Sequence, residues 1–198
     1  SGQNLGLGFV QLKPWDEREA AIIMASRFAR QKDHATLIKA VSILKERGIT
    51  PTLYLAGAGK SSLRKKAELQ VAELGLQQQV QFLGNISNLP ERLSNTQIFV
   101  LSTHWEGMPL ALVEGMAAGC ACIVSDVIGA REVIEPGVTG LRVPENDAIA
   151  MADAMQKLLQ NSSFSQKLAE AARAQALQHF TREHMWQKYL QLMPVSRT

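Results

Sequence analysis

The sequence is poor in the residues that build metal centres and disulfide frameworks. It has two cysteines and four histidines in 198 residues, and they do not have the spacing of a zinc site. Cys120 and Cys122 lie two positions apart in a predicted strand, so their side chains share one face, and we interpret them as small buried hydrophobic residues. The lack of a disulfide framework fits a reducing compartment and predicts a cytoplasmic protein.

Long hydrophobic runs and a strong charge imbalance are missing as well. No apolar stretch has the length of a transmembrane helix, and no signal peptide is seen. The 21 Lys and Arg residues exceed the 18 Asp and Glu residues by a net charge of +3, which gives no indication of nucleic-acid binding. With 46% hydrophobic and 20% charged residues, the composition is typical of a globular domain.

Several motifs of nucleotide chemistry are absent. The chain has no Gly-x-Gly-x-x-Gly fingerprint, no Asp-x-Asp metal motif and no recognisable Ser-His-Asp arrangement. Residues 59–61 read Gly-Lys-Ser like the end of a P-loop, but the glycine which that motif needs five positions before Gly59 is Tyr54. Gly57 and Gly59 are expected instead to allow a tight turn and the close approach of a ligand.

What the chain does contain is a regular alternation of short apolar runs and amphipathic segments. The apolar runs have the length of buried strands, and the segments between them have helical spacing. Strands are predicted at 21–26, 52–57, 80–84, 97–102, 121–125 and 140–143. Helices are predicted at 34–47, 61–74, 89–93, 109–118, 130–134, from Asn146 or Asp147 to 159, from Ser163 or Ser165 to about 179, and at 182–192.

This alternation predicts an α/β fold with a doubly wound parallel sheet of about six strands and helices on both faces, in a Rossmann-like domain. Residues 1–20 are expected to form a linker or edge segment, 21–178 the binding domain, and 179–198 a terminal helix. The wide apolar face of that last helix packs either on its own core or on a second domain. Ligands of such sheets bind beyond the carboxyl ends of the strands, so the loops there are the candidate sites.

The most informative loop lies in residues 104–119, where Glu106 and Glu114 stand eight positions apart. Pro109 is expected at the first helical position, where its missing N–H is not needed. Free N–H groups and the helix dipole would attract a phosphate between the two carboxylates. A ligand with phosphate and many hydroxyls, such as a nucleotide-sugar, suits this set. The alternatives are a solvated loop acid and a helix-surface acid.

Two cations follow the first predicted strand. Arg27 and Lys32 lie five positions apart in a loop that leads into a helix, so both could reach one diphosphate, Arg in a forked geometry and Lys as a point charge. A solvated basic loop is the alternative. His104 is given no role, and His34, His179 and His184 are interpreted as structural or exposed.

Together these residues resemble a known family. From about residue 22 to 159 the chain is similar to the carboxyl-terminal, donor-binding domain of GT-B glycosyltransferases of family 4, the "glycosyl transferases group 1" type. The Arg27 to Asp33 segment resembles that family's Arg…Gln-Lys-Gly segment, and Glu106 to Glu114 matches its Glu-x7-Glu motif. Residues 80–84 are similar to its base-binding strand end, and 125–132 to its Gly-Gly-x-x-Glu segment.

The resemblance implies a role for each matching position. Glu106 would be the catalytic residue that contacts the transferred sugar, and Glu114 would hold the ribose hydroxyls. Arg27 and Lys32 would bind the diphosphate. The donor-binding set is completed by backbone or loop positions that would hold phosphate and sugar oxygens or read the base, namely Gly57, Leu83, Gly84, Gly107, Met108, Pro109 and Leu110.

It also implies an activity, which is the retaining, metal-independent transfer of a hexosyl group to a polysaccharide or lipid-linked acceptor. The donor would be a nucleoside-diphosphate sugar, and a UDP-sugar is the favoured one. No cofactor and no metal ligand are expected. The acceptor-binding amino-terminal domain would be missing here, so the isolated chain is expected to be inactive. The missing domain would make any peripheral contact with the inner face of the membrane. The alternatives are a non-enzymatic nucleotide or sugar-phosphate binding module and a UDP-sugar epimerase-like domain.

The chain departs from the family pattern in the loop from Gly57 to Leu63, which is shorter than usual, and at two single positions. Asp33 stands where the family often has glycine, and Ile128 replaces the first glycine of the Gly-Gly pair. None of these departures removes a charged ligand group, so they bear on the identity of the base and the sugar.

Overall fold

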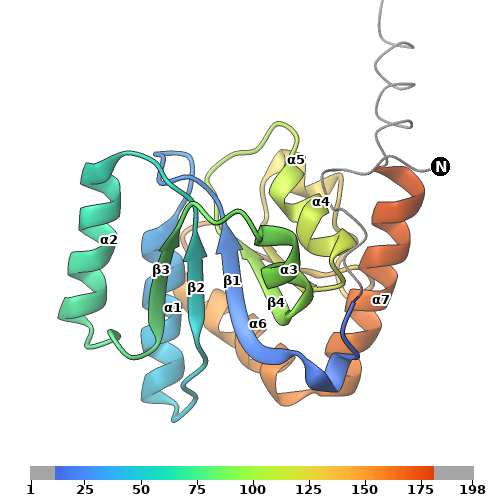
Figure 1. Ribbon diagram of the computed structural model, residues 1–198, viewed down its shortest axis with the longest axis horizontal. Coiled ribbons are helices and arrows are strands. Elements are labelled where there is room, and N and C mark those ends of the chain that lie inside the picture. Colours follow the sequence, from blue (N-terminus) through green and yellow to red (C-terminus); the bar gives the residue numbers. More distant parts are fainter. Residues whose placement is uncertain (1–11, 181–198) are drawn as a thin grey trace, which may run out of the picture.

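The computed structural model describes residues 12–180, which form a six-stranded sheet in the order β3-β2-β1-β4-β5-β6 with every pairing parallel (Figure 1). The α/β fold predicted from the sequence is confirmed. The strands are β1 (Glu19–Ala25), β2 (Leu53–Ala56), β3 (Val80–Gly84), β4 (Thr96–Leu101), β5 (Ala121–Ser125) and β6 (Leu141–Val143). The helices are η1 (Trp15–Glu17), α1 (His34–Glu46), α2 (Ser61–Glu73), α3 (Leu89–Ser94), α4 (Leu110–Ala117), α5 (Ile128–Arg131), α6 (Ala148–Gln160) and α7 (Ser162–His179).

The chain winds outward from the centre of this sheet twice. It runs from β1 through β2 to the β3 edge, returns to β4 on the other side of β1, and then runs through β5 to β6. In the view of Figure 1, α1 and α6 lie behind the sheet and α3 and α4 in front of it. The loops that follow β1 and β4 therefore meet at the point where the winding reverses, which is where doubly wound sheets bind their ligands.

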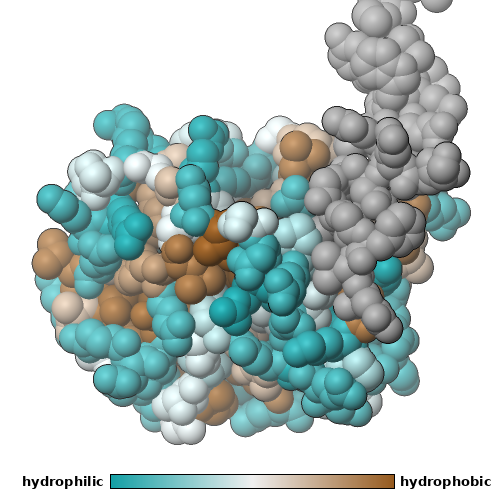
Figure 2. All heavy atoms as spheres, viewed as in Figure 1, coloured by the Kyte–Doolittle hydropathy of each residue, from teal (hydrophilic) through white to brown (hydrophobic). Residues whose placement is uncertain are grey.

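Burial explains why the inner strands are uninterrupted apolar runs. All residues of β5 are buried, as are the last five of β1 and the last four of β4, because helices cover both faces of the sheet. The edge strand β3 differs, since Phe82, Leu83 and Gly84 are only half-buried. Figure 2 shows hydrophobic side chains at the surface over this side of the sheet.

Side-chain caps set the start of three helices. Asp33, Asp147 and Asn161 each accept a hydrogen bond from the backbone N–H three residues later, at the beginning of α1, α6 and α7. The predicted cap at Asp147 is thus confirmed. The expected start of α7 at Ser163 or Ser165 is late, because Asn161 supplies the cap and the helix begins at Ser162.

The start of α4 corrects the position expected for Pro109. Its backbone angles (φ −79°, ψ 71°) are not helical, so Pro109 precedes the helix, which begins at Leu110. The proline still needs no N–H partner at this position, and its carbonyl accepts from the N–H groups of Leu112 and Val113.

The other end of α4 is held by two arginines from distant parts of the chain. The Arg18 guanidinium, which is largely buried, donates to the carbonyls of Ala118 and Gly119. Arg173 in α7 donates to the carbonyl of Ala117. Both cations satisfy carbonyls that the helix leaves unpaired and face the negative end of its dipole.

Within the described residues, regular structure is already present before residue 21. Trp15 is buried in η1, and β1 begins at Glu19, which pairs with Thr96 of β4. The helix predicted at 182–192 lies outside the described residues and stays a prediction.

The contact between α4 and β4 leads to a stability prediction. A Cβ on Gly115 would lie 2.6 Å from a ring carbon of Phe99, and both residues are buried. Gly115→Ala is therefore expected to lower the free energy of unfolding by about 1–3 kcal/mol in urea titrations, despite the better helix propensity of alanine. Adding Phe99→Leu should recover part of the loss, and a stabilising effect of Gly115→Ala alone would contradict the prediction.

Candidate functional site

The loops after β1 and β4 are joined through their backbones. Lys32 and Thr103 form an antiparallel bridge, and the N–H of His104 donates to the carbonyl of Gln31 (2.9 Å). The Thr103 hydroxyl donates to the same carbonyl (3.0 Å). This pairing holds two segments that are more than seventy residues apart in the sequence at one place on the carboxyl edge of the sheet.

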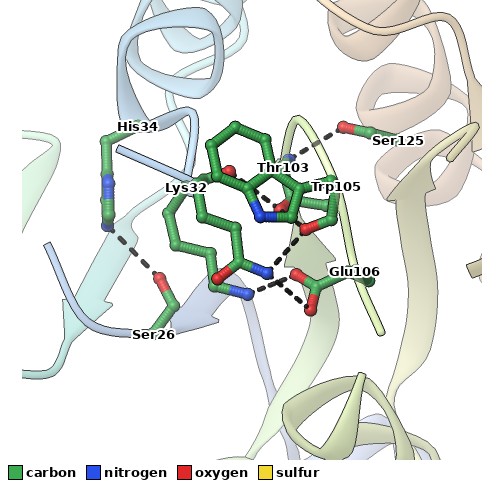
Figure 3. A network of polar contacts seen from close by, with 8 residues as sticks. Ser26, Lys32, His34, Thr103, Trp105, Glu106 and Ser125 are labelled. Carbon is green, nitrogen blue, oxygen red and sulfur yellow. Dashed lines mark hydrogen bonds and ion pairs between the residues drawn. The ribbon is translucent and has the colours of Figure 1, made fainter. Parts of the chain in front are cut away.

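The joined loops bring the Glu106 carboxylate against two side chains of the first loop, and Figure 3 shows Lys32 pointing toward it. Lys32 Nζ forms an ion pair with Oε1 of Glu106, and Gln31 Nε2 donates to Oε2 (3.2 Å) and to the carbonyl of Trp105 (2.6 Å). The side chains of Lys32 and Glu106 are only 14% and 5% exposed. A charged pair so little hydrated depends on hydrogen bonds that satisfy its remaining polar atoms, and Gln31 provides one.

A second set of contacts supports the Glu106 loop from β5 and α5. Ser125 Oγ, at the end of β5, accepts a hydrogen bond from the N–H of Thr103 (3.0 Å). At Gly129 in α5, a Cβ would lie 2.5 Å from the carbonyl oxygen of Glu106 and 2.4 Å from that of Gly107. Only glycine permits this approach, so the glycine retained in the segment at 125–132 has a packing reason.

The stretch from Gly107 to Leu110 presents backbone donors at the surface. Gly107, Met108 and Leu110 are exposed, whereas Pro109 is buried. Among the hydrogen bonds of the described residues, none is donated by the N–H of Gly107 or Met108. These two groups are therefore available to oxygens of a ligand, next to the start of α4.

Arg27 and Glu114, the other two predicted charges, are not joined to the Lys32–Glu106 pair. Arg27 lies exposed in the loop after β1, and Glu114 lies half-buried in α4. Within residues 12–180 neither side chain has a hydrogen bond or an ion pair. Burial raises the pKa of Glu114, because a carboxylate that is partly removed from water and has no cationic partner is harder to ionise.

The structure gives Gly57 a different close neighbour from the one expected. A Cβ there would lie 2.2 Å from the carbonyl oxygen of Ser26, so the glycine allows the loops after β1 and β2 to touch through their backbones. Its N–H donates to the carbonyl of Gly84 (2.7 Å), at the end of β3 beside the half-buried Leu83. The close approach is therefore between backbones, and the approach of a ligand at this position stays a prediction.

His34 is a buried part of this edge. Its ring stacks on Phe28 with centroids 4.2 Å apart, and its Nε2 lies 3.3 Å from the hydroxyl of Ser26. Burial lowers the pKa of His34 to about 4, so the ring is neutral at pH 7. The structural role expected for His34 agrees with this packing.

Gln31 and Thr103 are the site residues that the sequence reasoning missed. Gln31 falls on the glutamine of the family's Arg…Gln-Lys-Gly segment, but no role is predicted for it from the sequence. That motif could have pointed to Gln31. For Thr103, which lies three positions before Glu106 and has no charge or motif, the signal is its place in the loop after β4.

Two further features concern metal and membrane. Across residues 12–180 no three His, Cys, Asp or Glu side chains gather into a group that could hold a metal ion. In the same range no helix combines the length and the hydrophobicity needed to cross a membrane.

Comparison with known proteins identifies the family. Residues 10–175 match the family of glycosyl transferases group 1. The chain belongs to this family. The resemblance drawn from Glu106, Glu114 and the Arg27–Lys32 loop is thereby confirmed at the level of the family.

Individual relatives support the assignment. The chain is 30% identical over 175 residues to N-acetyl-alpha-D-glucosaminyl L-malate synthase of Bacillus anthracis, covering 87% of this chain and 45% of the relative. It is 26% identical over 178 residues to an alpha-1,4-N-acetyl-D-galactosaminyltransferase of Campylobacter jejuni whose name includes a PP-undecaprenol-linked glycan, covering 89% of this chain and 48% of the relative. Crystal structures of HepE from Anabaena with UDP and glucose share the fold, with a TM-score of 0.80 at 22% identity over 88% of this chain and 48% of that one. The chain thus spans less than half of the length of the curated relatives named here.

The buried ion pair leads to a prediction on stability. Lys32→Met leaves the Glu106 carboxylate buried with only Gln31 as partner, so it is expected to lower the free energy of unfolding more than Lys32→Met combined with Glu106→Gln. A double-mutant cycle in urea should give a coupling energy of about 1–3 kcal/mol. A coupling near zero would mean that the pair contributes nothing to the folded state.

His34 predicts a pH dependence of stability. The pKa of His34 is about 4 in the folded chain, against about 6.5 in an unfolded chain. Between these values the unfolded chain binds a proton that the folded chain does not, so stability falls as the pH drops. From pH 7 to pH 5 the loss due to His34 should be about 2 kcal/mol. In His34→Gln the loss of stability from pH 7 to pH 5, measured by urea titration at both pH values, should be smaller by this amount. An unchanged loss would contradict the assignment.

Proposed function

We propose that this chain is the donor-binding half of a retaining, metal-independent glycosyltransferase that uses a UDP-sugar. The observation that carries the proposal is the buried Lys32–Glu106 pair beside the unpaired N–H groups of Gly107 and Met108, at the reversal point of the sheet. UDP and glucose in the HepE crystal structure, which shares this fold, support a UDP-sugar as the donor class.

In this proposal the cations serve the diphosphate. Lys32 Nζ lies at the carboxyl edge of the sheet, and Arg27 is exposed in the same loop without a partner among residues 12–180. The free N–H groups of Gly107 and Met108 and the dipole of α4 would hold phosphate oxygens. When the sugar leaves, negative charge grows on the diphosphate, and donors fixed in advance stabilise it most effectively.

The carboxylates serve the hydroxyls. An ionised carboxylate only accepts hydrogen bonds, which suits the hydroxyl groups of a sugar or ribose. Glu106 would contact the transferred sugar at its reacting face, and the half-buried Glu114 would hold the ribose. The base would lie at the half-buried end of β3, against Leu83 and Gly84, with Gly57 beside them.

The remaining parts of the reaction belong to the rest of the protein. This chain matches less than half of the length of each of these relatives, so an acceptor-binding half is proposed to face the carboxyl edge of the sheet. We propose a polysaccharide or lipid-linked acceptor, a class that the Campylobacter relative names. A cytoplasmic location, with the acceptor half in contact with the inner face of the membrane, fits such an acceptor.

Calorimetric titration of this chain with UDP tests the proposal. Glu114→Ala should weaken UDP binding by about 1–3 kcal/mol, because it removes charge-assisted hydrogen bonds to the ribose. Glu73→Ala is the matched control, since Glu73 is exposed at the end of α2. No measurable binding of UDP to the unmodified chain would contradict the proposed donor, and equal affinities of both variants would contradict the ribose role of Glu114.

A further inference from the structure

Gln31 is a neutral side chain that donates a hydrogen bond to the Glu106 carboxylate. Its Nε2 lies 2.6 Å from the carbonyl oxygen of Trp105 and 3.2 Å from Oε2 of Glu106. Both partners can only accept hydrogen bonds, so the amide nitrogen rather than the amide oxygen must face them. The two N–H groups of one amide thus hold the peptide before Glu106 and the carboxylate of Glu106 at the same time.

The two oxygens of Glu106 are divided between two neighbouring residues. Oε1 contacts Lys32 and Oε2 contacts Gln31. Lys32, however, is also the cation proposed to bind the donor diphosphate. A diphosphate that attracts Lys32 Nζ weakens its hold on Glu106, because one ammonium group then serves two anions.

Gln31 does not share this conflict. Its amide is neutral and is fixed on the Trp105 carbonyl, and its own backbone carbonyl is fixed by His104 and Thr103. It can therefore keep Oε2 in place whether or not a donor occupies Lys32. This leaves the carboxylate aimed in one direction when the sugar arrives.

We propose that Gln31 is a positioning residue that orients the Glu106 carboxylate toward the hydroxyls of the donor sugar. The inference rests on the proposed function. It separates two contributions to donor binding: Lys32, Arg27 and the backbone of the Glu106 loop bind the UDP moiety, whereas Gln31 acts only on the sugar moiety, through Glu106.

Calorimetry on this chain tests the separation. UDP and three UDP-sugars (UDP-glucose, UDP-galactose and UDP-N-acetylglucosamine) are titrated, and the sugar donor that binds most tightly is kept. Gln31→Met preserves the length of the side chain but removes both N–H donors. It should weaken binding of that UDP-sugar about tenfold, the size of a lost hydrogen bond to a charged group, and change the affinity for UDP less than about twofold.

Gln97→Met is the matched control. Gln97 also donates its amide to a tryptophan carbonyl, that of Trp15, but it lies at the start of β4, away from the carboxyl edge. If Gln31→Met weakens binding of UDP and of the UDP-sugar by the same factor, or weakens UDP-sugar binding no more than Gln97→Met does, the inference is overturned while the proposed function stands. If the unmodified chain binds neither UDP nor any of the three UDP-sugars, it is the proposed function that fails.

A pH comparison separates positioning from general packing. Gln31→Glu puts a second carboxyl against Oε2 of Glu106, and two such groups can bond only when they share a proton. The diphosphate of a UDP-sugar is doubly esterified and has no titration between pH 5.5 and 8. Affinity of the Gln31→Glu variant for the UDP-sugar should therefore rise about fivefold or more from pH 8 to pH 5.5, relative to the unmodified chain. A pH-independent loss would mean that Gln31 only packs, and would overturn the inference.

Discussion

The adjacency of β1 and β4 is the constraint on which the rest of the site depends. Because the chain returns to the centre of the sheet after β3, the ends of these two strands lie side by side although more than seventy residues separate them. Backbone hydrogen bonds then join the two loops that follow, and only this pairing brings Lys32 and Gln31 to Glu106. The side chains supply the chemistry, but the order of the strands decides which of them can meet.

The two charged side chains at the centre of the site also neutralise each other. Lys32 and Glu106 are oppositely charged and nearly buried together, so the folded chain holds neither as an isolated ion. A donor that carries both anionic phosphates and neutral hydroxyls matches the two members of the pair separately. When no donor is bound, each charge of the pair neutralises the other, so burying the two together costs less free energy than burying either charge alone.

Much of this could be predicted from the sequence, because strand-length apolar runs and helical periodicity reflect local burial. β3 and β5 have the predicted bounds, and the place of Glu106 between an apolar strand and a helix marks it as a candidate site residue. The rest depended on contacts between distant segments. Gln31 matches a family motif, but its contact with Glu106 depends on a loop more than seventy residues away. The backbone neighbour of Gly57 likewise comes from another loop, and Pro109 differs by one position because cap geometry is set by local angles.

The two arginines at the far end of α4 have a consequence for the limits of the folded unit. Arg18 comes from the segment before β1 and Arg173 from α7, so the helix that starts at the Glu106 loop is anchored by the opening and closing parts of the described chain. A fragment that lacks Arg18 or Arg173 would leave the carbonyl of Gly119 or Ala117 without this hydrogen bond. The carboxyl end of α4 would then be held less firmly. A fragment that keeps both anchors of α4 must therefore extend beyond the first and last strands of the sheet, from Arg18 to Arg173.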